Sequence, residues 1–267
     1  MGKGGIVAIS RPPDAEYDGV ILKVEDVWKR FGGLQALRGV TLEVQRGEVL
    51  GVIGPNGAGK TTLFNVMTGF LPPDRGRVLV FGRDVTGKRP HLLSRLGVAR
   101  TFQITKPFEG LSVLENVLVG LLFSGRVSSR VRRGLSDLKE EAVRILEMVG
   151  LRDKRYQPGH SLTVVERKRL ELARALAVSP QILLLDEVMA GLSPAEVEWE
   201  LGMLRQVKEE RGLTIVMIEH VMKAIMNFSD RVAVLHHGEK IAEGTPKEIA
   251  SDPRVIEAYL GDQNVVG

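Results

Sequence analysis

The chain has 267 residues, of which 43% are hydrophobic and 26% are charged, a balance typical of a folded globular protein and not of a disordered one. Its 37 basic and 33 acidic side chains leave a net charge of only +4, too small an excess to indicate nucleic-acid binding. The chain has no cysteine, which excludes disulfides and thiolate metal sites and suits a reducing compartment.

The start of the chain shows no targeting pattern. Its apolar stretch is too short for a signal peptide and is followed by Pro, Asp and Glu, so we interpret residues 1–19 as a flexible extension. The longest apolar run, VLENVLVGLLF at 113–123, is interrupted by Glu115 and Asn116 and is too short to span a bilayer. We therefore expect any membrane role to be carried by a partner.

The first part of the chain alternates short β-rich runs with a glycine-rich loop and a helix. The predicted strands are ILKVEDV at 21–27, VTLEV at 40–44, EVLGVIG at 48–54 and RVLVFG at 77–82. A helix, KTTLFNVMTGF, is predicted between the last two. Strands return later as ILLLDE, TIVMIEH and RVAVLHHG, whose continuous apolar runs are typical of parallel strands buried on both faces. This order predicts an α/β fold.

The middle of the chain has helical periodicity. SVLENVLVGLLF, LSDLKEEAVRILEMVG and VVERKRLELARALAV each place apolar residues three and four apart. We interpret the basic segment at 124–134 as a solvated loop, with contact to acidic headgroups or to a partner as the alternative. We predict one domain over 20–262, divided into a core of about 20–95 and 166–245, a helical subdomain of about 96–165, and C-terminal helices over 246–262.

GPNGAGKT at 54–61 follows a predicted strand and precedes a predicted helix, the context that makes this pattern specific for phosphate binding. Its glycines let backbone N–H groups turn onto phosphate oxygens, and the helix adds its positive end. Lys60 can reach the β and γ phosphates, and the Thr61 hydroxyl can ligate Mg²⁺. The predicted ATP-binding residues here are Gly54, Pro55, Asn56, Gly57, Ala58, Gly59, Lys60, Thr61 and Thr62.

Polar side chains at the ends of later strands extend this site. Asp186 ends a buried strand at the edge where open α/β sheets bind ligands, and we predict that it holds Mg²⁺ through water. Glu187 could polarise the attacking water, with an ordinary surface carboxylate as the alternative. His220 ends TIVMIEH at the equivalent edge and could donate to a γ phosphate, with a structural histidine as the alternative.

Two more residues complete the candidate site. Gln103 in ARTFQ ends another predicted strand just before the helical region. It could contact both the water of the metal and a moving helical segment. Phe31 could stack on adenine; core packing is the competing interpretation, and Trp28 is the rival aromatic residue.

These motifs occur in the same order in ATP-binding cassette (ABC) ATPases, which the chain resembles over about residues 20–260. FGGLQAL, LSVLENVLVG and AEGTPKEIASDPRVIEAYLG are similar to the first of the two ATPase subunits of branched-chain amino acid importers. The resemblance implies a P-loop NTPase (RecA-like) core, an antiparallel β subdomain and an inserted α-helical subdomain that docks on membrane subunits.

The resemblance also implies roles for single residues. Phe31 stacks on adenine, Gln103 contacts nucleotide and metal, and Asp186 is a metal ligand. Glu187 is the catalytic base and His220 the switch, with Lys60 as the third catalytic residue. The implied cofactors are ATP and Mg²⁺, and the implied location is the cytoplasmic face of the cell membrane. The implied partners are a second cassette, two transmembrane permeases and, indirectly, a solute-binding protein, but no nucleic acid.

The signature segment departs from the family pattern. Leu162, Thr163, Val164, Val165 and Glu166 stand where the family usually has Leu-Ser-Gly-Gly-Gln. Thr163 keeps a hydroxyl, whereas Val165 replaces a glycine whose N–H approaches phosphate, and its β-branched side chain restricts the backbone. Glu166 adds a negative charge near an anion.

We therefore predict a heterodimer with a different second cassette, in preference to a homodimer, and two unequal ATP sites. The alternative is that the segment shifts slightly and contacts phosphate through Thr163 and the neighbouring backbone.

The sequence thus predicts the ATP-hydrolysing subunit of an importer of branched-chain amino acids, in which ATP binding closes the dimer and hydrolysis reopens it. The alternatives are a related transporter of urea, amides or lipid and a regulatory nucleotide-binding module, the latter disfavoured by the intact Lys60, Asp186 and Glu187. From another class, a cassette ATPase of DNA repair or translation would usually carry coiled-coil arms, tandem cassettes or zinc modules, which this sequence lacks.

Overall fold

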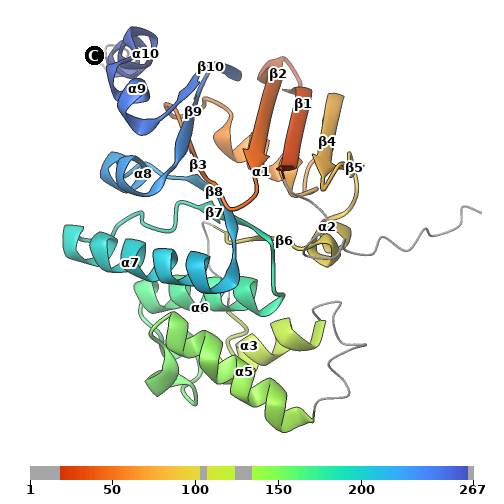
Figure 1. Cartoon of the computed structure of the whole chain (residues 1–267), viewed down its shortest axis with the longest axis vertical. Helices are drawn as coiled ribbons and strands as arrows, with labels where there is room; N and C mark the ends of the chain where they lie inside the picture. Colours follow the sequence, from red (N-terminus) through yellow and green to blue (C-terminus); the bar gives the residue numbers. More distant parts are fainter. Residues whose placement is uncertain (1–18, 103–106, 124–133, 264–267) are drawn as a thin grey trace, which may run out of the picture.

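The structure, a computed structural model, describes residues 19–102, 107–123 and 134–263 (Figure 1). Almost all of the extension predicted over 1–19 therefore lies outside the described residues, as does Gln103. Within the described ranges, no helix is both long enough and apolar enough to cross a bilayer.

A four-stranded antiparallel sheet forms one side of the molecule, with strand order β2-β1-β4-β5. Its strands are β1 (Val20–Phe31), β2 (Leu34–Gln45), β4 (Arg75–Val80) and β5 (Arg83–Asp84). β1 and β2 are longer than predicted because the two strands stay paired up to the turn, where Phe31 lies opposite Leu34. The buried face of this sheet packs with α1 (Lys60–Met67) in a core that includes Val24, Leu42 and Phe64.

A six-stranded sheet with order β10-β9-β3-β8-β7-β6 forms the centre. The strands are β3 (Val49–Ile53), β6 (Val98–Arg100), β7 (Ile182–Asp186), β8 (Thr214–Ile218), β9 (Arg231–His236) and β10 (Glu239–Gly244). Only β10 runs antiparallel to its neighbour. Because β3, β7 and β8 are parallel, the residues that follow them lie at the same edge of the sheet.

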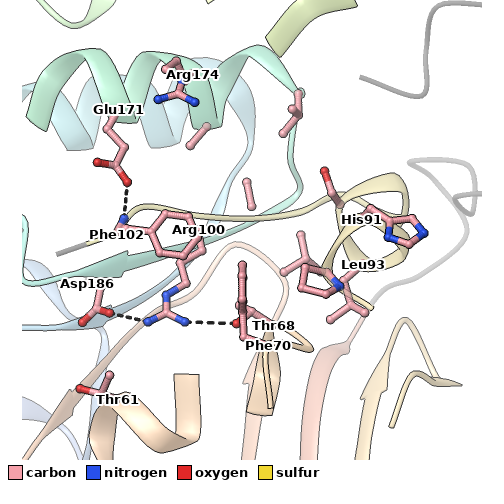
Figure 2. Close-up of a pocket in the computed structure, with 16 residues that line it drawn as sticks. Thr61, Thr68, Phe70, His91, Leu93, Arg100, Phe102, Glu171, Arg174 and Asp186 are labelled. Carbon is pink, nitrogen blue, oxygen red and sulfur yellow. Dashed lines mark hydrogen bonds and ion pairs between the residues drawn. The ribbon is translucent and has the colours of Figure 1, made fainter. Parts of the chain in front are cut away.

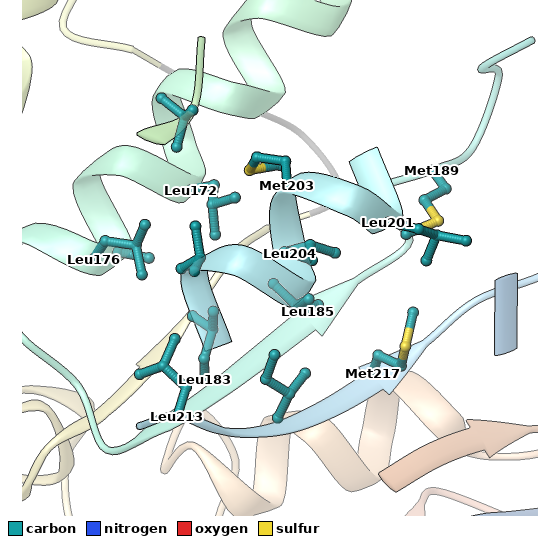
Figure 3. Packing of buried hydrophobic residues seen from close by; sticks show 14 of the residues in the cluster. Leu172, Leu176, Leu183, Leu185, Met189, Leu201, Met203, Leu204, Leu213 and Met217 are labelled. Carbon is teal, nitrogen blue, oxygen red and sulfur yellow. The ribbon is translucent and has the colours of Figure 1, made fainter. Parts of the chain in front are cut away.

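Helices cover both faces of the central sheet and form a layer at one end (Figure 1). The helices not yet named are α2 (Pro90–Leu96), α3 (Val113–Phe123), α5 (Leu135–Met148), α6 (Val164–Ala177), α7 (Pro194–Arg211), α8 (Met222–Phe228), α9 (Pro246–Ser251) and α10 (Pro253–Gln263). α3 packs against α5 and α6, and α7 lies between these helices and the sheet. Figure 3 shows Leu204 of α7 beside Leu185 of β7, and Leu201 of α7 beside Met189.

The architecture confirms the predicted α/β class, with an antiparallel sheet and inserted helices. One predicted boundary is wrong: β6 falls in the range assigned to the helical subdomain, yet it pairs with β7 and extends the central sheet. The sequence indicates this strand at ARTFQ but not its place in the central sheet, because its partner β7 lies far along the chain. The two helices α9 and α10 lie where the C-terminal helices were predicted.

Candidate functional site

The phosphate-loop motif connects β3 to α1 and is shaped by its glycines. Gly54, Gly57 and Gly59 have φ values of +148°, +78° and +103°, which L side chains rarely adopt. A Cβ atom would lie 2.1 Å from the backbone oxygen of Leu235 at Gly54, and 2.5 Å from that of Ala36 at Gly59. Bare backbone is therefore required on both sides of the loop, and the cradle ends at the N-terminus of α1, where anions are stabilised.

Lys60 is buried at the start of α1, with only 6% of its surface exposed. Its Nζ donates to the backbone oxygens of Gly54 and Pro55, at 2.6 and 2.9 Å, so the side chain folds back across the loop. Burial lowers the pKa of Lys60, and the carboxylates of Glu187 and Asp186 oppose that shift. An ammonium group is thus already held where the loop would receive phosphate.

A cavity of about 400 Å³ lies against the loop. Lys60, Thr61, Glu187 and His220, which come from three separate elements, all line it. Phe31 also lines this cavity from the end of β1 and is 48% exposed. Trp28 is not part of the lining; its Nε1 donates instead to Asp26, at 2.7 Å. Of the two candidate aromatic residues, only Phe31 is therefore placed to meet a base.

Glu187 leaves the sheet in a strained conformation. Its φ of +51° places a non-glycine residue in the left-handed region, an uncommon state that clusters at functional sites. The Glu187 amide donates to the backbone oxygen of Ile218, at 2.9 Å. One carboxylate oxygen lies 2.9 Å from Nε2 of His220. The two residues that sequence reasoning proposed as base and switch are thus in direct contact.

Asp186 has a different partner, Arg100 at the end of β6. Arg100 Nη2 lies 2.6 Å from an Asp186 oxygen, and both side chains are at most 6% exposed. Arg100 Nη1 also donates to Asn65 Oδ1 at 2.7 Å, and Figure 2 shows the guanidinium between Asp186 and Thr68. The importance of Arg100 was missed because only Gln103 of the ARTFQ motif was considered.

Thr61 and Asp186 line a second, larger cavity of about 760 Å³ between the sheet and α6. A hydroxyl and a carboxylate are the hard oxygen donors that Mg²⁺ prefers, so these two residues fit the predicted metal role. Gln103, the third predicted ligand, is outside the described residues. Thr61 lines both cavities, which places the candidate metal ligands beside the phosphate loop.

Glu171 of α6 reaches into the same larger cavity (Figure 2). It accepts a hydrogen bond from the backbone N–H of Phe102, and burial raises its pKa to about 7. This residue was also missed, although a lone carboxylate on the apolar face of the RLELARAL helix is a usable signal. Glu171 connects the helix that follows the signature segment to the strand end that precedes Gln103.

The signature segment forms the start of α6. Leu162 is buried and precedes the cap, Thr163 is the N-cap residue, and Val164 is 71% exposed. Thr163 Oγ1 accepts from the Glu166 amide at 3.3 Å, and Glu166 Oε2 accepts from the Thr163 amide at 3.0 Å. This reciprocal pair is a capping box. The helix N-terminus therefore holds a carboxylate from its own chain.

Glu166 is also neutralised from the preceding segment. Its Oε1 forms an ion pair with Lys154. Partial burial alone would raise the pKa of Glu166, but the bonds to Lys154 and Thr163 outweigh it and lower the pKa. The negative charge of Glu166, which the sequence places near the nucleotide of a second cassette, is thus compensated by Lys154 of this chain.

Family comparisons match two parts of the chain. The family described as "ABC transporter" matches residues 37–190, and the one described as "Branched-chain amino acid ATP-binding cassette transporter" matches residues 239–263. The first match contains the phosphate loop, Asp186 and Glu187. The second covers β10, α9 and α10.

Curated relatives match nearly over their full lengths. The high-affinity branched-chain amino acid transport ATP-binding protein LivG of Salmonella typhimurium is 40% identical, over 91% of this chain and 98% of that protein. The corresponding BraF protein of Pseudomonas aeruginosa is 38% identical over the same shares. A probable LivG protein of Archaeoglobus fulgidus is 37% identical, over 91% of this chain and 96% of its own.

Solved structures show the same arrangement. The ADP conformation of MJ1267, an ATP-binding cassette of an ABC transporter, superposes with a TM-score of 0.81 at 36% identity, covering 91% of this chain and 99% of that one. A dimeric post-hydrolysis state of the cassette MJ0796, bound to ADP and Pi, superposes with a TM-score of 0.74 at 26% identity, covering 84% and 98%.

Proposed function

Because this chain belongs to the ABC transporter family of ATP-binding cassettes, we propose that it is the ATP-binding and ATP-hydrolysing subunit of an importer of branched-chain amino acids. One observation carries the substrate class: residues 239–263, from β10 to α10, match the model of branched-chain amino acid cassettes. The relatives named for branched-chain amino acid transport support the same class over 91% of the chain.

In this proposal the phosphate loop and Lys60 bind the phosphates of ATP. Glu187 faces the same cavity and polarises the attacking water. His220, whose Nε2 contacts the Glu187 carboxylate, can exchange that contact for one to the γ phosphate. Thr61 and Asp186 would hold Mg²⁺, which would neutralise phosphate charge during hydrolysis. Phe31 offers its exposed ring to adenine at the rim of the cavity.

We propose that the chain works at the cytoplasmic face of the membrane with a second, different cassette and two permeases, and indirectly with a solute-binding protein. The larger cavity supports docking of a permease: it is open on the surface and carries the exposed rings of Phe70 and Phe102. Solvent-exposed aromatic groups of this kind mark protein contact sites. The chain itself never meets the solute, so solute choice belongs to these partners.

Reconstitution tests the proposal. The chain is co-expressed with the proposed second cassette, two permeases and a solute-binding protein, and the complex is placed in proteoliposomes. We expect MgATP-dependent uptake of leucine, isoleucine and valine, and little uptake of urea or acetamide. ATP-driven uptake of urea or acetamide without leucine uptake would reject the substrate class. Absence of ATP hydrolysis by the assembled complex would reject the ATPase role.

A further inference from the structure

The loop between β7 and α7, residues 187–193, begins with the proposed catalytic base. Two hydrogen bonds within the loop are long, at 3.3 Å from the Ala190 amide to the backbone oxygen of Glu187 and 3.2 Å from the Leu192 amide to the backbone oxygen of Met189. Gly191 has a φ of +78°, so the loop turns sharply before α7. Contacts from outside the loop therefore also help to fix the position of Glu187.

One outside contact comes from the end of β8. Glu219, which directly precedes His220, is 2% exposed, and its Oε1 accepts from the Met189 amide at 2.9 Å. Ile218, the residue before it, accepts from the Glu187 amide at 2.9 Å. Ile218, the last residue of β8, and Glu219, the residue after it, thus bind two backbone amides of the loop. The Met189 side chain is fully buried beside Leu201 (Figure 3), which keeps its amide in place.

A second contact comes from α6. Lys168 Nζ donates to the backbone oxygen of Ala190, at 2.6 Å. Lys168 lies slightly more than one helical turn after Thr163, the cap of the signature segment. The loop is therefore held from one side by the strand that leads to His220 and from the other by the signature helix.

A purely structural role would leave the carboxyl of Glu219 unexplained. Burying a carboxyl group is costly unless its hydrogen bonds are satisfied, and Oε2 of Glu219 makes no hydrogen bond to any described residue. An apolar side chain would pack at this position without that cost. What the carboxyl provides is an acceptor for the Met189 amide, next to the contact between Glu187 and His220.

We propose that Glu219 is a positioning residue for ATP hydrolysis, which holds the 187–193 loop through the Met189 amide and so keeps Glu187 against His220. Lys168 holds the same loop from the signature helix and links the position of that helix to the base. The proposal rests on the ATPase activity proposed above. Neither Glu219 nor Lys168 contacts the candidate phosphate cavity, so both act through the loop.

The first test measures the exposure of the loop amides and does not depend on ATPase activity. Hydrogen exchange of the peptide containing residues 188–192 is followed in the full chain for the wild type, Glu219→Leu and Glu219→Gln. We expect at least tenfold faster exchange of the Met189 amide in Glu219→Leu and no change in Glu219→Gln, because glutamine keeps an acceptor oxygen. Unchanged exchange in Glu219→Leu would overturn the proposal.

The second test separates turnover from binding in the assembled transporter. Glu219→Leu and Lys168→Met are each expected to lower kcat about tenfold, with KM for ATP within twofold, while Glu219→Gln keeps kcat within twofold. Glu200→Leu is the matched control, since Glu200 is a similarly buried carboxyl that pairs with Arg169 and not with the loop. It should lower the melting temperature without changing kcat.

Several results would overturn the proposal. One is a normal kcat in Glu219→Leu despite fast exchange, and another is a tenfold loss in Glu219→Gln despite slow exchange. If Glu219→Leu does not fold, Lys168→Met tests the proposal in its place, since the Lys168 side chain is only half-buried. A normal kcat in Lys168→Met would then count against the proposal. A wild-type transporter that hydrolyses no ATP would reject the proposed function instead, and the exchange experiment would still decide the contact.

Discussion

Asp186 and Glu187 are neighbours in the chain but have opposite surroundings. Asp186 is 3% exposed and bound by Arg100 at 2.6 Å, whereas Glu187 faces the smaller cavity and contacts His220 at 2.9 Å. The left-handed backbone at Glu187 turns the chain out of the strand, which separates the two carboxylates. Different environments let adjacent carboxylates take different roles, here the proposed metal ligand and the proposed base.

Replacing Lys60 with alanine should abolish tight ATP binding. The ammonium group is a charged partner for buried phosphates, and its loss costs on the order of 2–5 kcal/mol, or about 30-fold or more in affinity. Calorimetric titration with MgATP measures the effect, and Lys139→Ala on the exposed side of α5 serves as the control. Normal ATP affinity in folded Lys60→Ala would remove the phosphate site from this loop.

Stability should fall as pH rises through neutrality. Burial raises the pKa of both Glu171 and Glu219 from 4.5 to about 7. As pH rises, the unfolded chain therefore loses these two protons at a lower pH than the folded state does. The contribution of the two carboxyls to the free energy of unfolding is fully present below about pH 4.5 and is lost as pH rises through about 7. The charged groups that act on them are Arg100, Arg174 and Asp186 for Glu171, and Lys168 and Glu187 for Glu219.

Thermal unfolding between pH 5.5 and 8 at fixed ionic strength checks this dependence. The wild type should lose melting temperature across the range, and Glu171→Gln and Glu219→Gln should each flatten the curve, because glutamine does not titrate. A double variant with the same slope as the wild type would show that these two carboxyls are not responsible.

At the scale of elements, α6 connects most of the site. Its first turn is the signature segment, Lys168 reaches the 187–193 loop, and Glu171 reaches the backbone of Phe102. Its apolar residues, among them Leu172 and Leu176, bury it in the main core (Figure 3). A displacement of α6 would therefore disturb both the loop that carries Glu187 and the backbone at Phe102, just before Gln103.

Glu166 should stabilise α6 and leave this chain's own ATP binding unchanged. Loss of an N-cap interaction costs about 0.5–2 kcal/mol, which corresponds to a melting temperature lower by roughly 2–4 °C per kcal/mol for a domain of this size. Glu166→Ala and Thr163→Ala should both show the loss, and Glu166→Gln should keep the cap. If Glu166→Ala is as stable as the wild type but the transporter hydrolyses ATP faster, the carboxylate acts on nucleotide and not on the helix.

Much of this architecture could be predicted from the sequence, because its signals are local. The glycines of the phosphate loop and the buried runs that end at Asp186 and His220 each stand in a short segment, and parallel strand edges bring such segments together. Residues such as Arg100 and Glu219 could not be assigned, because their partners lie 86 and 30 residues away. The capping box is different: Thr163 and Glu166 fit the Thr-x-x-Glu pattern, so this cap is predictable from the sequence alone.

At the scale of the whole molecule, the two cavities meet at Thr61. The smaller one holds the phosphate loop and Glu187, and the larger one opens between the central sheet and α6. The Arg100–Asp186 pair lies in the larger cavity, so a candidate metal ligand is connected to the surface where we propose that a permease docks. The start of α6 lies outside both linings, where it can face the nucleotide of another cassette.

This separation leads to the prediction that the two ATP sites of the transporter are unequal. We propose that the ATP bound by Lys60 and Glu187 is completed by the signature of the partner cassette, and that the ATP of the partner faces Thr163, Val165 and Glu166. The helix N-terminus is already occupied by the carboxylate of Glu166. Losing one or two charge-assisted hydrogen bonds there costs roughly 1.5–3 kcal/mol each, enough to slow that site strongly.

A pair of glutamate variants in the reconstituted transporter checks this inequality. Glu187→Gln should lower ATP turnover by roughly 10²-fold or more, the scale of lost general-base catalysis, while the equivalent change in the partner cassette should cost much less, because the site it disables is already slow. Single-turnover hydrolysis by the assembled complex, with MgATP binding measured beside it, separates slow chemistry from weak binding. Equal losses from the two variants would mean that the signature segment reaches phosphate through Thr163 and its neighbouring backbone, and that the sites are equivalent.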